Sequence, residues 1–545
     1  MNLYTLYKRE TTIPGTSVVA MAVVSGVANA VLLAIINTAS KSSYSAFINQ
    51  KFFWLFGIAL ALFLIGKKYA LEKATEIAEN IIRGMRVRLS DKIRQSELLD
   101  LEGLGKSDIY NRITQDTEII SQAALMIING LQSSVMLFFC ILYLAVLSKI
   151  ALVMTLFSVI IAALVFLHYE KKVIHKIQET KVKENVFLDK IQQIIHGFKE
   201  LKLSKQKNDH HFQTMEKVAV ETEVLKVDTQ KKYIIGFLFS QTFFYLLIAA
   251  VLFLLPKLDD IKPQLIIQIT TSILFIIGPI EVLVNAIPFH TKADVAIARL
   301  YSLEESLDTT RREKSKDQPV HPACPPINDF QTIEFNNVYF HYPAKDPANT
   351  FSVGPIDFTL QKGEILFLIG GNGSGKSTLL KLITGLYYPV SGELRIDGRQ
   401  INYQDYPAFR ELFSAIFDDF FLFDHLYGMD EIPVEQVQSL LQLMQLENKV
   451  EFVDGSFSDI NLSTGQRKRL AMIVSLLDDK PICVYDEWAA DQDPEFREYF
   501  YKQLLDDLKA QGKTLIAVSH DDRYFSDADR VIKMDYGKMT SLDQV

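Results

Sequence analysis

A glycine-rich loop carries the clearest chemistry in the sequence. Residues Gly370 to Ser377 match G-x-x-x-x-G-K-S, between a strand-like run and a helix-like run. In such a loop the backbone amides and the helix N-terminus face phosphates, so we predict a nucleotide site. Lys376 is expected to bridge the β- and γ-phosphates, and Ser377 to ligate Mg²⁺. Backbone curvature is assigned to Gly371, Gly373 and Gly375. The predicted ATP-binding residues of the loop are Gly370, Asn372, Gly373, Ser374, Gly375, Lys376, Ser377 and Thr378.

A pair of acidic residues supplies what hydrolysis would need next. Asp486 and Glu487 end the strand-like run PICVYDE. Asp486 is predicted to bind Mg²⁺ through water, and Glu487 to orient the attacking water as the catalytic base. An acidic pair alone often ends a strand as a solvated cap. Because this pair follows an apolar strand in a chain that already has the phosphate loop, we favour the hydrolytic interpretation.

The elements around these motifs alternate between two kinds. Strand-like runs (TIEFNNVYF, EILFLIG, PICVYDE, TLIAVSH) are interleaved with helix-like runs (KSTLLKLITGL, GQRKRLAMIVSLL, EFREYFYKQLLDDLKAQ). This alternation predicts an α/β domain with a largely parallel sheet.

Charge is distributed unevenly along the 545 residues, although the whole chain has a net charge of only −8 and is 49% hydrophobic. Residues 1–330 contain 37 Lys and Arg against 31 Asp and Glu, a balance of +6, whereas residues 331–545 contain 20 against 34, a balance of −14. The acidic second part argues against a nucleic-acid partner, which needs clustered cations. Three cysteines without metal-ligand spacing exclude a disulfide scaffold and a zinc cluster, and Cys140 and Cys483 are expected to be small buried side chains.

The first part of the chain reads as a membrane domain. Each of its six apolar stretches is close to the ~20 residues that a helix needs to cross the hydrocarbon core. They are residues 16–39, 52–71, 124–147, 150–169, 233–255 and 264–290. The long polar connections 72–123 and 170–232 carry most of the Lys and Arg between the spans, so we place these connections and both chain ends in the cytoplasm.

The two long connections show helical periodicity and could extend well beyond the bilayer, toward a cytoplasmic domain. Their turning points are expected around Leu98 to Tyr110 and Gly197 to His211. After the last span, residues 302–330 lack an apolar period and contain four prolines, which predicts a linker. The predicted domains are therefore a membrane domain (1–301), a linker (302–330) and a nucleotide domain (331–545).

With these elements in place, residues 331–545 resemble the nucleotide-binding domain of an ABC transporter. The run NLSTGQRKRL matches the family's signature through Ser463, Gly465 and Gln466, with Thr464 in place of a usual glycine. In the family this motif completes the ATP site of a partner domain, and a helix N-terminus near Ser463 would suit a γ-phosphate.

The resemblance also assigns four further residues. His520 matches the switch histidine at the γ-phosphate, Tyr342 the aromatic residue that stacks on adenine, and Asp493 the acid of a loop that crosses to the partner site. Asp418 stands where most members have a glutamine. We expect Asp418 to contact Mg²⁺ or position water, and we hypothesise that it couples nucleotide state to the membrane helices.

Six spans ahead of one nucleotide domain resemble an ABC half-exporter. The implied fold is an α-helical polytopic membrane domain with long cytoplasmic extensions, joined to an α/β P-loop NTPase domain of ABC type. The implied assembly is a homodimer that uses ATP and Mg²⁺, in the inner membrane of a bacterium and in contact with its lipids, with the turning points of the connections docked on the nucleotide domains. An auxiliary periplasmic partner is left open.

Two phrases, HGFKELKLSKQK and FRELFSAIFDDFFLFD, are similar to the cyclic-peptide exporter branch. They imply efflux of peptide-like cargo: a cyclic or lasso peptide, a lipopeptide or a siderophore precursor. The alternatives are a lipid flippase or multidrug exporter, and an ATP-gated membrane sensor without net transport. Glu281, after a Gly-Pro break in the last span, is either an interfacial or structural residue or a cavity residue that favours cationic cargo. Weaker cavity candidates are Asn29, Gln132, Gln241 and Gln268.

Overall fold

The computed structural model describes residues 3–10, 15–41, 46–258, 262–316, 327–343, 351–429 and 431–542. The chain forms two compact units. The helical unit comprises Met1–Leu89 and Tyr110–Ser302, and the α/β unit comprises Ser90–Ile109 and Leu303–Val545. The α/β unit therefore includes a short piece of the first long connection.

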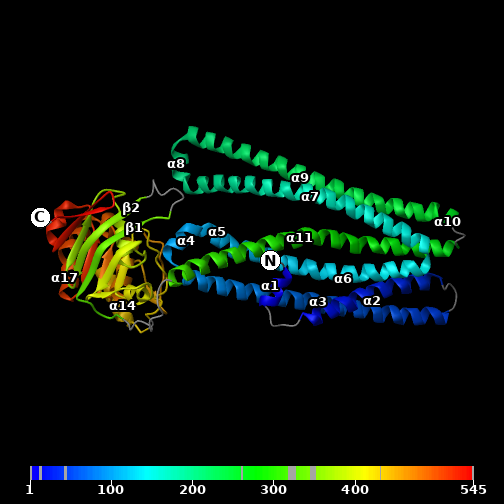
Figure 1. The fold of residues 1–545 in the computed structure, drawn as a ribbon, viewed down its shortest axis with the longest axis horizontal. Helices are drawn as coiled ribbons and strands as arrows, with labels where there is room; N and C mark the ends of the chain where they lie inside the picture. Colours follow the sequence, from blue (N-terminus) through cyan, green and yellow to red (C-terminus); the bar gives the residue numbers. More distant parts are fainter. Residues whose placement is uncertain are drawn as a thin grey trace. The chain divides into compact units, whose positions relative to one another are not determined.

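Long helices make up the helical unit (Figure 1). Helix α7 packs along α9, and α2 packs along α6. Helices α3 and α11 begin in this unit and continue into the α/β unit. The helices are α1 (Leu3–Glu10), α2 (Thr16–Lys41), α3 (Ala46–Arg94), α6 (Thr117–Leu147), α7 (Lys149–His196), α8 (Phe198–Leu203), α9 (Lys205–Phe253), α10 (Leu255–Leu258) and α11 (Pro263–Lys316). A π-helical turn (Arg112–Asp116) precedes α6.

The predicted spans fall within these helices. Within the described residues, five helical segments are long and apolar enough to cross a membrane: Thr16–Ala39, Gln50–Arg94, Asp108–Leu147, Lys205–Lys257 and Pro263–Asp308. The fourth predicted span, 150–169, lies in α7, where the segment Lys149–Val165 is a shorter apolar helix. Large apolar side chains such as Phe53 and Trp54 are exposed on these helices, as a hydrocarbon environment permits.

The helix after the last span continues into the region predicted to be a linker. Helix α11 extends to Lys316, so residues 302–316 are helical rather than irregular. The four prolines behind the linker prediction all lie within residues 317–326, outside the described residues. Nothing in the composition before them breaks a helix, which explains why α11 continues.

Two sheets organise the α/β unit. The six-stranded sheet has the order β12-β11-β3-β10-β9-β6, and all its pairings are parallel except that of β12 with β11. Its strands are β3 (Ile365–Ile369), β6 (Phe413–Ile416), β9 (Ile482–Tyr485), β10 (Thr514–Val518), β11 (Arg530–Asp535) and β12 (Lys538–Leu542). An antiparallel sheet has the order β2-β1-β4-β5, with β1 (Thr332–His341), β2 (Ser352–Gln361), β4 (Ser391–Ile396) and β5 (Arg399–Gln400). A small hairpin pairs β7 (Phe452–Val453) with β8 (Ser456–Phe457).

Short helices complete this unit. They are α4 (Leu98–Leu104), α5 (Lys106–Asn111), α12 (Lys376–Ile383), α13 (Tyr406–Arg410), α14 (Val434–Leu443), α15 (Thr464–Leu477), α16 (Pro494–Tyr499) and α17 (Leu505–Ala510). Of these, α5 runs from this unit into the helical unit, which resumes at Tyr110.

The central strands carry a hydrophobic core on each face of the six-stranded sheet. In β3, Ile365 and Phe367 belong to one cluster, whereas Leu366 and Leu368 belong to the other. This alternation follows from the two-residue repeat of a strand, and it explains why the run is apolar at every position. Loops at the carboxyl ends of such strands are the usual place for ligands. The predicted motifs follow β3, β9 and β10 at this edge.

The cysteines behave as predicted where the structure describes them. Cys140 and Cys483 are buried free thiols, and Cys324 lies outside the described residues.

Candidate nucleotide site

The phosphate loop joins β3 to α12, and its curvature depends on three glycines. The φ angles of Gly370, Gly373 and Gly375 are +146°, +76° and +105°. The predicted curvature is therefore confirmed at Gly373 and Gly375 but wrong at Gly371, because Gly370 takes the left-handed conformation instead. A Cβ atom on Gly370 would lie 2.3 Å from the carbonyl oxygen of Met534. Only glycine fits this conformation and this approach.

The loop has the polar groups that a phosphate requires. The buried Lys376 ammonium donates to the carbonyl oxygens of Gly370, at 2.9 Å, and Gly371, at 3.1 Å. The Oγ atom of Ser374 is buried and has no hydrogen-bond partner among the described residues. An unpartnered buried hydroxyl is costly unless a ligand completes it, so these groups fit an anion in the loop.

Carboxylates gather next to Ser377. Asp486 follows β9, is only 3% exposed, and hydrogen-bonds the Ser377 side chain. Burial raises the pKa of Asp486, and the neighbouring charges of Glu487 and Asp418 add to the rise. Concentrated negative charge beside a hydroxyl suits Mg²⁺, which takes few protein ligands and completes its shell with water and phosphate oxygens. Among the described residues, no group of three or more His, Cys, Asp or Glu side chains is arranged to hold a metal.

Glu487 and His520 are in direct contact. The Nε2 atom of His520 lies 2.9 Å from Oε1 of Glu487, and both side chains line a cavity of about 270 Å³. Glu487 itself has left-handed backbone angles of φ 50° and ψ 33°. Two residues that lie 33 positions apart in the sequence are thus brought together by the parallel pairing of β9 and β10.

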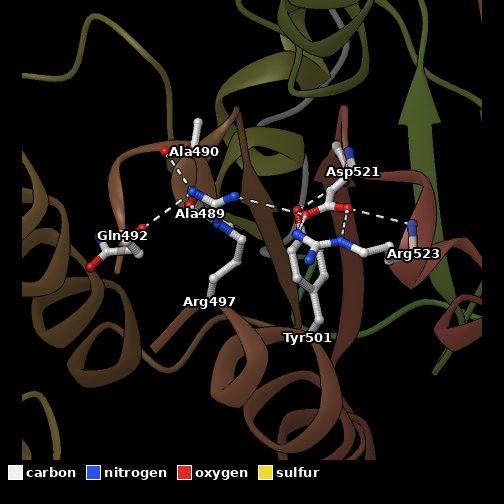
Figure 2. A network of polar contacts seen from close by, with 8 residues as sticks. Ala489, Ala490, Gln492, Arg497, Tyr501, Asp521 and Arg523 are labelled. Atoms are coloured by element: carbon white, nitrogen blue, oxygen red, sulfur yellow. Dashed lines mark hydrogen bonds and ion pairs between the residues drawn. The ribbon is translucent and has the colours of Figure 1, made fainter. Parts of the chain in front are cut away.

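Arg497 stabilises the loop that follows Glu487 through hydrogen bonds (Figure 2). Its guanidinium donates to the carbonyl oxygens of Ala489, at 3.2 Å, Ala490, at 3.1 Å, and Gln492, at 3.2 Å. The same group lies 3.8 Å from the carboxylate of Asp521, the residue after His520. In Figure 2 the Asp521 carboxylate is also held by Arg523, which contacts both of its oxygens. The two loops that carry Glu487 and His520 are therefore tied together.

The signature run forms a helix start, as predicted. Ser463 is the N-cap of α15, and its side chain and that of Gln466 form a reciprocal capping box. A Cβ atom on Gly465 would lie 2.7 Å from the carbonyl oxygen of Asp491, so glycine permits close approach of the loop after Glu487. The signature motif therefore packs directly against the loop that follows Glu487.

Two residues assigned by resemblance also make local contacts. Tyr342, just after β1, is hydrogen-bonded through its hydroxyl to the Thr378 hydroxyl, at 2.9 Å, which places it beside the start of α12. Asp493 accepts a hydrogen bond from the amide of Phe496 and so caps α16, and it also pairs with Arg469. Contact of Asp493 with a second copy stays a prediction.

Asp418 lies in the loop after β6 and is 69% exposed. Its carboxylate lies 3.6 Å from the ammonium of Lys468. The substitution of aspartate for glutamine is therefore accompanied by a nearby lysine, which we had not singled out in the sequence.

The first turning point docks within the α/β unit. Leu98 and Leu99 of α4 pack against the hydrophobic cluster that includes Phe335 and Leu380. Glu97 accepts from Arg410 at 2.8 Å, and Glu102 accepts from the Tyr387 hydroxyl at 2.6 Å. We predicted docking by this segment but neither of these pairs, because partners about 300 positions apart leave no local signal. The second turning point, α8, belongs to the helical unit, and its docking stays a prediction.

The membrane candidates lie in three different places. Asn29, Gln132 and Glu281 line a cavity of about 540 Å³ between α2, α3, α6 and α11, together with Lys67. Gln268 instead donates to the carbonyl oxygen of Asn37, at 3.0 Å, and is buried between α2 and α11. Gln268 therefore joins helices rather than lining the cavity, a role that amides often have in membranes. Gln241 lies on α9, and none of the described residues that line this cavity belongs to α9.

Comparison with known proteins identifies the family. The family model of ABC transporters matches residues 353–490. The chain is 32% identical over 532 residues to the ATP-binding protein SyrD of Pseudomonas syringae pv. syringae, covering 95% of this chain and 92% of that protein. It is 28% identical over 295 residues to an ATP-dependent lipid A-core flippase of Alkalilimnicola ehrlichii, covering 52% of this chain and 48% of that protein. The solved structure of a bacterial Atm1-family ABC exporter with ATP bound has the same fold, with a TM-score of 0.76 at 16% identity over 96% of this chain and 93% of that chain. The chain therefore belongs to the ABC transporter family, as a half-exporter that fuses a helical membrane domain to an ATP-hydrolysing domain.

Proposed function

We propose that two copies of this chain form an exporter that uses ATP to move peptide-like molecules across the inner membrane of a bacterium. The observation that carries the proposal is the contact between Glu487 and His520 beside Ser377 and Asp486. A site with these groups is equipped for repeated hydrolysis rather than for binding alone. The same chain has helices that are long and apolar enough to cross a membrane, so hydrolysis could be coupled to transport.

Each residue has a part in the proposed reaction. Lys376 and the loop amides hold the phosphates, while Ser377 and Asp486 would hold Mg²⁺, which neutralises phosphate charge when bound. Glu487 orients the attacking water, and His520 keeps the Glu487 carboxylate in place through the hydrogen bond at 2.9 Å.

We propose a homodimer because each chain has one phosphate loop and one signature motif, and a complete ATP site would combine the loop of one copy with the signature of the other. Ser463 caps α15 with its side-chain oxygen on the protein surface, where a second copy can offer its phosphate loop. Two-fold pairing then gives two equivalent sites.

The experiment is transport into liposomes, with the parent chain compared with Glu487→Gln. Loss of both hydrolysis and peptide accumulation, with ATP binding retained, is expected because the amide cannot act as a base. The matched control is Glu435→Gln, the same change at an exposed position in α14, which should behave as the parent. Accumulation that survives Glu487→Gln would overturn the hydrolytic assignment.

Cargo is assigned from the membrane cavity. Glu281 and Lys67 both line it, with the amides of Asn29 and Gln132, so the cavity offers a carboxylate and several hydrogen-bonding groups to a peptide. We therefore propose that Glu281 favours cationic peptides. Glu281→Gln should reduce transport of a cationic peptide more than that of a neutral analogue, and an equal loss for both would refute charge selection.

Lipid cargo is the alternative that a specific observation favours. One relative is named as a lipid A-core flippase, although the alignment covers about half of each chain. Stimulation of ATP hydrolysis by lipids rather than by peptides, in otherwise identical liposomes, would select this alternative.

A further inference from the structure

Lys468 is a buried lysine on α15, and it has no role in the proposed reaction. Its side chain is 2% exposed. The Nζ atom donates to the backbone carbonyl of Glu487 at 2.8 Å and lies 2.7 Å from the Asp491 carboxylate. The third neighbour is Asp418, at 3.6 Å. The ammonium group therefore ends among the residues that surround the hydrolytic site.

Such burial needs compensation, and the contacts supply it. An ammonium has three N–H donors, and an unpaired buried charge is strongly unfavourable. One carbonyl and two carboxylates face the three donors of Lys468. The loop after β9 therefore holds the ammonium group of Lys468 through Glu487 and Asp491. The same contacts hold this loop against α15.

The backbone of Lys468 holds the next residue of the same loop. Its carbonyl oxygen accepts a hydrogen bond of 2.7 Å from Nε1 of Trp488. Trp488 is fully buried, and its ring lies against that of Phe500, with centroids 4.7 Å apart. Lys468 thus forms hydrogen bonds with both Glu487 and Trp488.

The hydrogen bond from Lys468 stabilises an unfavourable backbone conformation of Glu487. Glu487 is a non-glycine residue in the left-handed region, a strained state that persists only where the surroundings enforce it. The Glu487 carbonyl is the group whose direction defines that turn, and Lys468 binds it directly.

We propose that Lys468 is a positioning residue for ATP hydrolysis. It holds the Glu487 backbone so that the carboxylate stays beside His520, and it keeps Asp491 and Asp418 around the same point. The proposal rests on the proposed function of Glu487 as the group that orients water. A misplacement of about 1 Å at a reacting group lowers a rate by roughly 10²-fold, so this support is expected to matter for kcat.

The first test replaces Lys468 by methionine, which keeps an unbranched side chain but removes the charge and all three donors. Measured on the full chain in nanodiscs, Lys468→Met should lower kcat for ATP by tenfold or more. The KM should change less than threefold, because the contacts of Lys468 are with Glu487, Asp491 and Asp418 rather than with the phosphate loop. Lys502→Met is the matched control, since Lys502 forms an exposed pair with Glu498 within one helical segment, and it should match the parent.

The second test separates positioning from folding. In Lys468→Gln the amide can still donate to the Glu487 carbonyl but carries no charge to balance the two carboxylates, so kcat should fall at least threefold and remain above that of Lys468→Met. If Lys468→Met does not yield folded protein, the kcat and KM of Lys468→Gln decide alone.

Three results would overturn the proposal. They are a kcat within threefold of the parent for Lys468→Met, a parent-like kcat for Lys468→Gln, or equal factors of change in kcat and KM. Glu487→Gln is measured in parallel. If it abolishes hydrolysis while the Lys468 variants do not change kcat, only this inference fails, whereas full hydrolysis by Glu487→Gln would remove the proposed function itself.

Discussion

The attachment of α4 to the rest of the α/β unit can be tested at one ion pair. Arg410 donates to Glu97 at 2.8 Å, to the Tyr388 hydroxyl at 2.5 Å and to the Gly385 carbonyl at 2.7 Å. In Arg410→Met, Glu97 would retain the hydroxyl of Tyr403, at 3.2 Å, as a hydrogen-bond donor. The substitution therefore weakens the polar anchor of α4 and leaves its apolar contacts in place.

The size of the effect follows from burial. Hydrogen bonds to charged groups contribute about 1.5–3 kcal/mol when the partner is left behind. Glu97 is 15% exposed and Arg410 is 29% exposed, so water replaces part of the lost interaction. We expect the attachment to weaken by about 1–2 kcal/mol, which changes the ratio of attached to detached α4 by roughly 5–30-fold.

The assay is peptide transported per ATP hydrolysed in liposomes. If α4 transmits movement between nucleotide and membrane elements, this ratio should fall several-fold in Arg410→Met while basal hydrolysis changes little. Glu97→Gln should act in the same direction. The double variant should be no worse than Arg410→Met alone, because the two substitutions share the Glu97–Arg410 pair, whereas Arg410→Met also removes the hydrogen bonds to Tyr388 and Gly385. Arg395→Met, which removes an exposed pair with Glu393, serves as the control. Additive losses, or an unchanged ratio in both single variants, would refute the reasoning.

Three further predictions concern the nucleotide domain. Asp418→Ala should lower both substrate-stimulated hydrolysis and transport, and full retention of both would contradict its coupling role. Gly370→Ala should abolish binding of a fluorescent ATP analogue, because its Cβ atom would clash with the Met534 carbonyl, whereas Gly371→Ala, which meets nothing within 4 Å, should retain binding. Burial raises the pKa of Glu364, so its contribution to stability is complete below the ordinary glutamate pKa of about 4.3 and is lost as pH rises through the raised value. Glu364→Gln should therefore gain thermal stability relative to the parent as pH rises from roughly 4 to 7, and a constant difference would contradict this sign.

Local patterns in the sequence were sufficient to predict much of this domain. The fully apolar run of β3, the phosphate loop and the helix start at Ser463 each depend on residues close together in the chain. Physical rules that act over four to eight residues, such as strand burial and helix capping, therefore place these elements correctly.

Side-chain pairing between distant segments could not be predicted in the same way. Glu97 and Arg410 are 313 positions apart, and nothing near either residue indicates the other. Lys468 appears in the sequence as one of three cations in a charged helix start, a pattern typical of solvated faces. It is buried because α15 packs beneath the loop after β9, a consequence of strand order. The sequence analysis did not predict that α11 continues to Lys316, although the relevant signal is local. Prolines end a helix only where they occur, and the four prolines all lie after Lys316.

The position of Lys468 on α15 connects two parts of the proposed reaction. Ser463 begins this helix, and Lys468 lies five residues further on, about 7.5 Å along the axis. If a second copy places its nucleotide at Ser463, any shift of α15 toward that nucleotide acts on Lys468 as well, because a short helix moves as a rigid body. Lys468 in turn binds the Glu487 carbonyl of its own chain. In the proposed dimer, a helix whose first turn would serve one ATP site would thus support the water-orienting residue of the other, and closure of the two copies would set the geometry for hydrolysis in both.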